Sequence, residues 1–162
     1  MKQQLVSGNK LLIALLSSTL LAACAPQSVA IDPNRENEKP LVLTTFTVLA
    51  DMARQVAGER LQVRSIVKPG AEIHGYEPTP SDLEKAADAD LVVENGLGLE
   101  LWANRFLRAA GKVPRLTLSE GMTPLLIEGD AYAGKPNPHA WMSPQRAMGY
   151  VDGLVAGFSQ ID

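Results

Sequence analysis

Three observations predict an α/β fold: a four-stranded, mainly parallel sheet with helices on both faces. Along residues 41–162, short apolar or β-branched runs alternate with segments of helical periodicity, and glycine or proline marks most of the junctions. The chain is 46% hydrophobic and 20% charged, as an ordinary globular domain is. Alternating strands and helices are typical of parallel sheets that right-handed crossovers cover on both sides.

The first part of this domain is predicted to be a strand, a helix and a second strand. The apolar and β-branched run at 41–46 gives the first strand. The helix that follows is closed by Gly58 at the usual C-terminal stop. Apolar and polar residues then alternate over 61–67, which predicts a strand leading into the Pro69-Gly70 turn. The apolar face of the helix consists of Val48, Leu49, Met52, Ala53 and Val56.

The middle of the domain continues the alternation. Thr79 fits a helix N-cap and Pro80 the first helical position, while Asp82 is placed to return a capping bond. This helix is expected to end near Ala87. The next elements are predicted at 91–94 (strand), 95–98 (turn), 99–110 (helix, ended by Gly111) and 115–118 (strand).

A long irregular segment, residues 119–138, precedes the last helix. Segments of about twenty residues without regular structure are usually functional in a compact domain. His139 closes the segment, and Ser143 and Pro144 begin the helix. One apolar face of this helix is predicted from Ala147, Met148, Val151, Leu154, Val155 and Phe158.

The two histidines of the chain lie in turns of the same kind. His74 is central in KPGAEIHGYEPTPSDL (68–83), and His139 lies in KPNPHAWMSP (135–144). Ligands of open parallel sheets bind at the carboxyl ends of strands, where the His74 turn and the Gly96-Gly98 pair are expected to open. A single histidine in a turn is more often structural, but two in matching proline-bracketed turns favour a shared divalent metal site.

Four residues beside the histidines are further candidates for this site. Glu72 and Glu77 could ligate a metal or hold a histidine ring, although their spacing favours solvated turn carboxylates. Tyr76 and Trp141 could wall the site from water, and ordinary aromatic packing accounts for them equally well.

Residues 1–23 are predicted to be an export signal. Lys2 and Lys10 flank a polar start, and the apolar run 11–23 is shorter than the about 20 residues that a membrane span needs. The run ends in LAAC (21–24), which resembles the lipobox of bacterial lipoproteins, where cleavage precedes the cysteine and its sulfur carries a lipid. Cys24 is the only cysteine, so it has no intramolecular disulfide partner. An ordinary signal peptide that ends near a cysteine is the alternative.

Residues 24–40 are expected to tether the lipidated cysteine to the domain, because they are polar and contain three prolines. Removing residues 1–23 takes away two lysines and no acid, which changes the formal net charge from −3 to −5. An acidic domain disfavours nucleic acid as a partner. Attachment of more than one lipid chain would hold the protein at a membrane surface.

Three ordered segments resemble one protein family: PGAEIHGYEPTPSDL (69–83), ADLVVENGLGLELW (89–102) and NPHAWMSP (137–144). They are similar to segments of the substrate-binding lipoproteins of bacterial manganese, iron and zinc ABC transporters. The resemblance covers 41–162 and implies the N-terminal one of two α/β lobes, with the metal held between the lobes. His74 and His139 match the two histidine ligands of that lobe. In that family a connecting helix leads to the C-terminal lobe, which gives two more ligands; this sequence is expected to be a truncated chain that stops before both.

The resemblance also implies a location and partners. Such a protein is lipid-anchored at a bacterial membrane, faces the periplasm or the cell exterior, and delivers metal to a permease and ATPase complex; we expect a monomer. Zinc members often carry a histidine-rich loop before the second histidine, whereas 119–138 contains no histidine, which favours manganese or ferrous iron and leaves zinc possible.

Two expectations follow for metal binding. With half of the ligands missing, the isolated chain should bind metal weakly or undetectably. Because both histidines must be neutral to bind, a complete protein should release its metal on acidification through roughly pH 6.

Other functional classes fit the sequence less well. A metal-dependent hydrolase needs an open coordination position and a general base, and the sequence has no His-Glu-x-x-His motif and no Gly-x-Ser-x-Gly turn. Leu101 occupies the third glycine position of a dinucleotide fingerprint that would begin at Gly96. The chain is therefore not expected to be an enzyme. A surface adhesin or interaction lipoprotein without transport activity is the alternative function.

Overall fold

A computed structural model describes residues 38–162 of the chain. The predicted signal peptide at 1–23, the lipidation site Cys24 and all but the end of the tether at 24–40 lie outside the described residues, so these remain predictions. Within the described part, no helix is long and apolar enough to cross a membrane.

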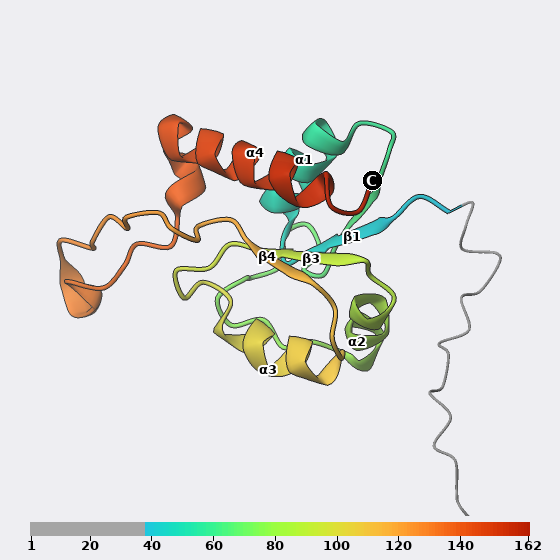
Figure 1. Ribbon diagram of the computed structural model, residues 1–162. Coiled ribbons are helices and arrows are strands. Elements are labelled where there is room, and N and C mark those ends of the chain that lie inside the picture. Colours follow the sequence, from blue (N-terminus) through green and yellow to red (C-terminus); the bar gives the residue numbers. More distant parts are fainter. Residues whose placement is uncertain (1–37) are drawn as a thin grey trace, which may run out of the picture. The chain divides into compact units, whose positions relative to one another are not determined.

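Four parallel strands form one sheet in the order β2-β1-β3-β4 (Figure 1). β1 lies between β2 and β3, and β3 also pairs with β4, so the two central strands are covered on both edges. This confirms the predicted four-stranded parallel sheet, although β1, β2 and β4 are shorter than the predicted runs. The strands are β1 (Leu41–Thr44), β2 (Gln62–Ser65), β3 (Leu91–Glu94) and β4 (Arg115–Thr117).

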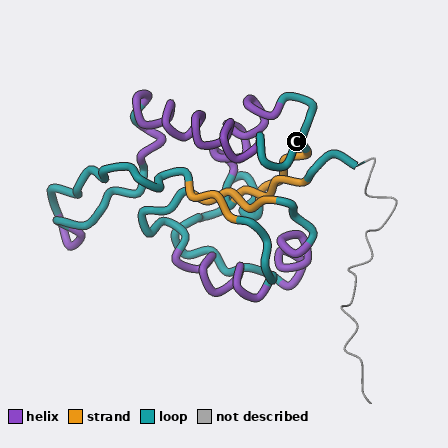
Figure 2. The backbone as a smooth tube through the Cα atoms, viewed as in Figure 1, coloured by secondary structure: helices purple, strands orange, loops and turns teal. Residues whose placement is uncertain are grey.

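Helices cover both faces of the sheet, as predicted. Figures 1 and 2 show α1 and α4 on one face and α2 and α3 on the other. Adjacent strand residues point to opposite faces: Val42 packs with the α1 and α4 side, and Leu43 with the α2 and α3 side. The helices are α1 (Thr47–Ala57), α2 (Pro80–Ala87), α3 (Leu101–Ala109) and α4 (Pro144–Phe158).

The caps of two helices match their sequence signals. Gly58 ends α1 with a positive φ of 55° that glycine adopts at low cost, and its N–H bonds the carbonyl of Arg54. At α2, the side chain of Thr79 accepts the N–H of Asp82, and the Asp82 carboxylate accepts the N–H of Thr79. The predicted capping box is therefore confirmed. α3 begins at Leu101, later than predicted, because Glu100 before it has φ −105° and ψ 60°, outside the helical region.

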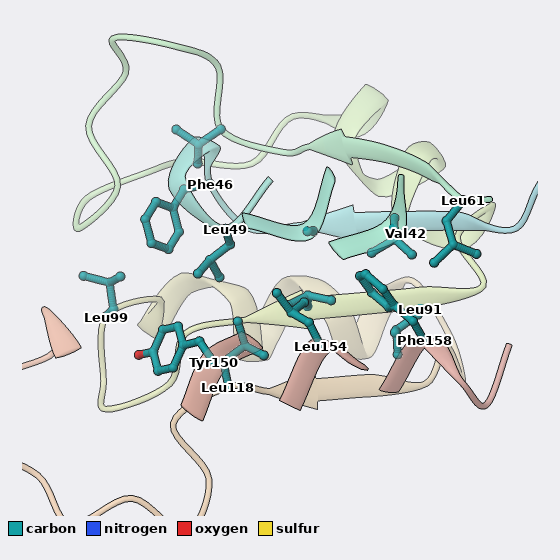
Figure 3. Packing of buried hydrophobic residues seen from close by; sticks show 14 of the residues in the cluster. Val42, Phe46, Leu49, Leu61, Leu91, Leu99, Leu118, Tyr150, Leu154 and Phe158 are labelled. Carbon is teal, nitrogen blue, oxygen red and sulfur yellow. The ribbon is translucent and has the colours of Figure 1, made fainter. Parts of the chain in front are cut away.

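The predicted apolar face of α4 is partly wrong. Leu154 and Phe158 are buried as expected, but Met148 is 69% exposed and Val155 is 51% exposed. The buried line is Tyr150, Leu154 and Phe158, each four residues from the next, and Figure 3 shows these side chains beneath Leu49 and Val42. Gly157 lets the helix approach the sheet closely, since a Cβ there would lie 2.7 Å from Cδ2 of Leu116.

Candidate functional site

The structure brings the two histidines together. His74 lies in the connection from β2 to α2, and His139 precedes a 3₁₀ turn, Ala140–Met142, that leads into α4. Their ring centroids are 5.4 Å apart, with the ring planes inclined at 64°. Two turns that are far apart in the chain therefore meet at one point beside the carboxyl ends of the strands.

The ring of His139 is oriented by a neighbouring amide. The side-chain oxygen of Asn137 accepts the backbone N–H of His139 at 3.0 Å and lies 3.0 Å from ring Nδ1. Since an amide oxygen only accepts, Nδ1 carries the proton, and Nε2 keeps its lone pair. This is the arrangement that prepares a histidine for a metal, because the second ring nitrogen fixes the tautomer. Sequence reasoning missed Asn137, although its position two residues before His139 is a local signal.

Trp141, which the sequence left open as a wall of the site or a packing residue, lies against His139. The centroids of the two rings are 5.3 Å apart, and Trp141 packs in turn on Phe46, which follows β1. Partial burial and the nearby charge of His74 lower the pKa of His139 below its ordinary value. Both effects favour the neutral ring, which is the form that binds metals.

The candidates around His74 are placed differently. His74 is exposed, and its N–H donates to the carboxylate of Glu72 at 2.9 Å. Tyr76 turns toward α2, where its hydroxyl donates to Asp82 at 2.9 Å, and its ring packs on Trp102. Burial and the Asp82 carboxylate raise the pKa of Tyr76 to about 12. Glu77 is exposed and does not line the groove that contains the histidines.

A buried network of hydrogen bonds connects the end of β3 with the segment before His139 and with α4. Asn95, at the end of β3, donates its side-chain amide to the carbonyl of Pro138 at 2.9 Å and accepts the Tyr150 hydroxyl at 2.6 Å. The Glu100 carboxylate accepts the N–H groups of Asn95 and Gly96 and the hydroxyl of Thr45. Burial raises the pKa of Glu100, and these three donors oppose the shift. Sequence reasoning missed this network, since only its three-dimensional contacts distinguish its members.

The histidines line a groove of about 760 Å³. Its other walls come from the turn before α3 and from the irregular segment after β4, including Lys135 and Tyr132, seen as the orange loop in Figure 1. Leu101 and Tyr132 line it and are 73% and 58% exposed, so much of the groove is apolar and open to solvent. An apolar, solvent-facing surface of this kind commonly marks an interaction site.

The geometry fits two imidazole ligands on one ion. Metal–nitrogen bonds of about 2.1 Å place the ring centroids of two ligating histidines roughly 5 Å apart around a tetrahedral ion. In the described residues, however, no three histidine, cysteine, aspartate or glutamate side chains gather closely enough to hold a metal. The described residues therefore bring two imidazole rings together, and a metal bound there would need further ligands from elsewhere.

Comparison with known proteins identifies the family. The family described as zinc-uptake complex component A, periplasmic (ZnuA) matches residues 42–162. The chain belongs to the ZnuA family. This confirms the family resemblance of the three sequence segments.

Individual ZnuA-family relatives agree with this assignment. The iron-binding protein YfeA of Yersinia pestis is 43% identical over 141 residues, which cover 87% of this chain and 43% of YfeA. The manganese ABC transporter substrate-binding lipoprotein PsaA of Streptococcus pneumoniae is 33% identical over 160 residues, covering 94% of this chain and 50% of PsaA.

Solved structures show the same fold. A manganese-bound periplasmic metal-binding protein from Candidatus Liberibacter asiaticus superposes with a TM-score of 0.69 at 31% identity, covering 76% of this chain and 46% of that one. The chain thus spans about half the length of the ZnuA-family relatives that it matches.

Proposed function

We propose that this chain belongs to the extracytoplasmic solute-binding component of a divalent-metal ABC importer, and that His74 and His139 bind the metal. One observation carries the proposal: the rings meet with centroids 5.4 Å apart, and His139 has its Nδ1 held by Asn137. Family relatives named for iron and manganese support the same function.

The proposed site is incomplete within the described residues. Two imidazoles leave a divalent metal largely hydrated, so the remaining ligands come from protein outside the described residues, and in the resembling family they come from the C-terminal lobe. The exposed apolar side chains that line the groove, such as Leu101 and Tyr132, support a second protein surface closing over it.

The proposed metal is manganese or ferrous iron, with zinc possible. Imidazole ligands suit all three metals, and raw affinity favours zinc over the other two. Residues 119–138 contain no histidine, in contrast to the histidine-rich loop of many zinc-specific relatives. The named relatives include both an iron-binding and a manganese-transporting protein, so both metals are tested below.

The proposed role is capture and delivery without catalysis, as part of an exported, lipid-anchored monomer. Cys24 would carry the lipid, and the recipient would be a permease and ATPase complex, since ABC importers comprise these parts. The adhesin alternative has less support, because the relatives are named for metal binding and transport; these include FimA of Streptococcus parasanguinis, a metal ABC transporter substrate-binding lipoprotein.

A titration of the full chain with Mn²⁺, followed by NMR, tests the proposal. The chain has only two histidines, so labelling histidine alone gives two sets of ring signals. Paramagnetic Mn²⁺ should broaden both sets together, and His74→Ala should reduce the broadening at His139. Glu77→Gln is the matched control and should leave it unchanged. Independent broadening of the two rings would contradict a shared site.

Calorimetry of the same chain with Mn²⁺, and with Fe²⁺ under anaerobic conditions, tests whether the metal site is incomplete. We expect weak binding, at or below what calorimetry resolves, because two neutral ligands are present where a tight site has about four. Micromolar or tighter affinity for either metal would show that the chain already holds a complete site.

A further inference from the structure

The two histidine turns are anchored in the same way by one segment. The carbonyl oxygen of the residue before each histidine accepts a hydrogen bond from a side chain of residues 95–102. Nε1 of Trp102 donates to the carbonyl of Ile73 at 2.9 Å. Nδ2 of Asn95 donates to the carbonyl of Pro138, also at 2.9 Å. We call residues 95–102, which comprise the turn after β3 and the first two residues of α3, the β3–α3 clamp.

Both donors of the clamp are themselves fixed. Asn95 is fully buried, and its side-chain oxygen accepts the hydroxyl of Tyr150 while its backbone N–H donates to Glu100. Trp102 packs between Tyr76, at a centroid distance of 5.1 Å, and Phe106, at 6.0 Å. The donors of both bonds therefore come from one short segment, and each is held by further contacts of its own.

Each bond acts directly on a histidine. The carbonyl of residue i−1 and the N–H of residue i belong to one planar peptide group, so a bond to that carbonyl fixes the plane from which the histidine side chain departs. Hydrogen bonds from the same segment hold both peptide planes, and this limits the distance between the two rings. Asn137 and Glu72, in contrast, lie in the same turns as the histidines and orient only their own neighbours.

We propose that Asn95 and Trp102 are positioning residues that hold His74 and His139 at metal-sharing distance. The proposal rests on the proposed metal-binding role of the two histidines. It predicts that removing either hydrogen bond separates the rings and weakens joint binding, even when the fold survives.

The test uses the full chain with labelled histidine. A nuclear Overhauser effect between the two rings reports their proximity without any metal. Trp102→Phe keeps an aromatic ring and removes the indole N–H, and Asn95→Ala removes the amide. Each change should weaken the inter-ring effect and lower the apparent affinity in the Mn²⁺ broadening titration about fivefold, as expected for one lost hydrogen bond.

Two controls separate positioning from general stability. Phe158→Leu and Leu91→Ala reduce packing in the buried core and leave the hydrogen-bond partners of Asn95 and the ring neighbours of Trp102 in place. Both should lower the urea midpoint and leave the inter-ring effect and the Mn²⁺ response unchanged. If Asn95→Ala does not fold, Trp102→Phe alone decides the result.

The outcomes distinguish this inference from the proposed function. An unchanged inter-ring effect in Trp102→Phe, or an equal loss in Phe158→Leu, would overturn the positioning role. If the inter-ring effect is lost in Trp102→Phe while His74→Ala leaves Mn²⁺ broadening at His139 intact, the clamp positions the rings but the shared metal site is wrong.

Discussion

Tyr150 of α4 donates a hydrogen bond of 2.6 Å to the side-chain oxygen of Asn95 at the end of β3, and both side chains are fully buried. The bond joins the helix that follows His139 to the turn that lines the histidine groove. Within the described residues, no buried side-chain nitrogen or oxygen is left without a partner, so this network is complete. Complete buried networks favour one defined arrangement, whereas a missing member is costly.

Tyr150→Phe should therefore destabilise the chain by about 1–2 kcal/mol, because the oxygen of Asn95 then lacks its buried donor. Urea unfolding of the full chain measures the loss. Ser81→Ala removes an exposed hydroxyl at the start of α2 and should stay within about 0.5 kcal/mol of wild type. Equal stabilities of wild type and Tyr150→Phe would show that the bond contributes nothing.

Two neighbouring glycines of the clamp should respond differently to alanine. Gly96 and Gly98 both have positive φ angles, 84° and 80°. A Cβ at Gly96 would lie 2.5 Å from Oγ of Ser119 and 2.6 Å from Cγ2 of Thr117, whereas one at Gly98 meets nothing within 4 Å. Backbone strain costs each variant about 1–2 kcal/mol, and the clash should cost Gly96→Ala about 1–3 kcal/mol more.

The difference between the two glycine variants is the measured quantity. Thr117 cannot easily move aside, because its hydroxyl donates to Glu94 at 2.7 Å. Denaturant unfolding is measured for Gly96→Ala and Gly98→Ala. The backbone strain common to both variants drops out of the difference between their free energies of unfolding. A similar loss of stability in both variants would mean that the sheet edge shifts readily at Gly96.

The sequence predicted what is encoded locally. Alternating strands and helices give the parallel sheet, and the Thr79 to Asp82 spacing gives the capping box of α2, because the residues involved are close in the chain. The last helix was harder. Apolar residues lie on several sides of α4, including Met148 and Val155, which are exposed. The periodicity of apolar residues therefore did not identify the side with Tyr150, which faces the sheet.

The candidate site was predictable to the same extent. Matching turns pointed to His74 and His139, and the structure places them together. The residues that hold them were not predictable. Asn95 and Pro138 are 43 positions apart, and the Trp102 bond to Ile73 spans 29 positions, so no local pattern reveals either contact.

Asp82 should make the chain sensitive to acid. Burial alone would raise the pKa of this carboxyl, but hydrogen bonds from Thr79, Lys85 and Tyr76 outweigh it and hold the pKa well below its usual range. A pKa lowered by folding contributes stability above the unfolded value of about 4 and loses it as the pH falls further.

Asp82→Asn removes this contribution and part of the capping box. We expect the free energy of unfolding to fall by about 1–2 kcal/mol at pH 7, and this difference from wild type should become smaller as the pH falls below about 4. Glu84→Gln, a matched change on an exposed residue of the same helix, should have little effect. Urea midpoints of the three proteins between neutral and acidic pH give the comparison. A constant gap across that range would exclude the carboxylate as its source.

Metal release should occur in a different pH window from acid unfolding. Burial and the charge of His74 lower the pKa of His139, which favours its neutral ring. As the pH falls through roughly 6, protons compete for the ring nitrogens, and bound metal should leave. The Asp82 contribution to stability is lost only below about pH 4. Acid should therefore release metal from a folded chain.

The Mn²⁺ broadening of the histidine signals, followed from pH 7.5 to about pH 5, tests this order of events. Broadening of the histidine signals should disappear while the urea midpoint of the wild-type chain stays nearly constant. Because the side-chain oxygen of Asn137 accepts a hydrogen bond from Nδ1–H of His139, the released ring should gain its proton at Nε2, and ring nitrogen shifts report which atom changes. Broadening that persists at about pH 5, with both rings protonated, would rule out ligation by the histidines and direct attention to carboxylates.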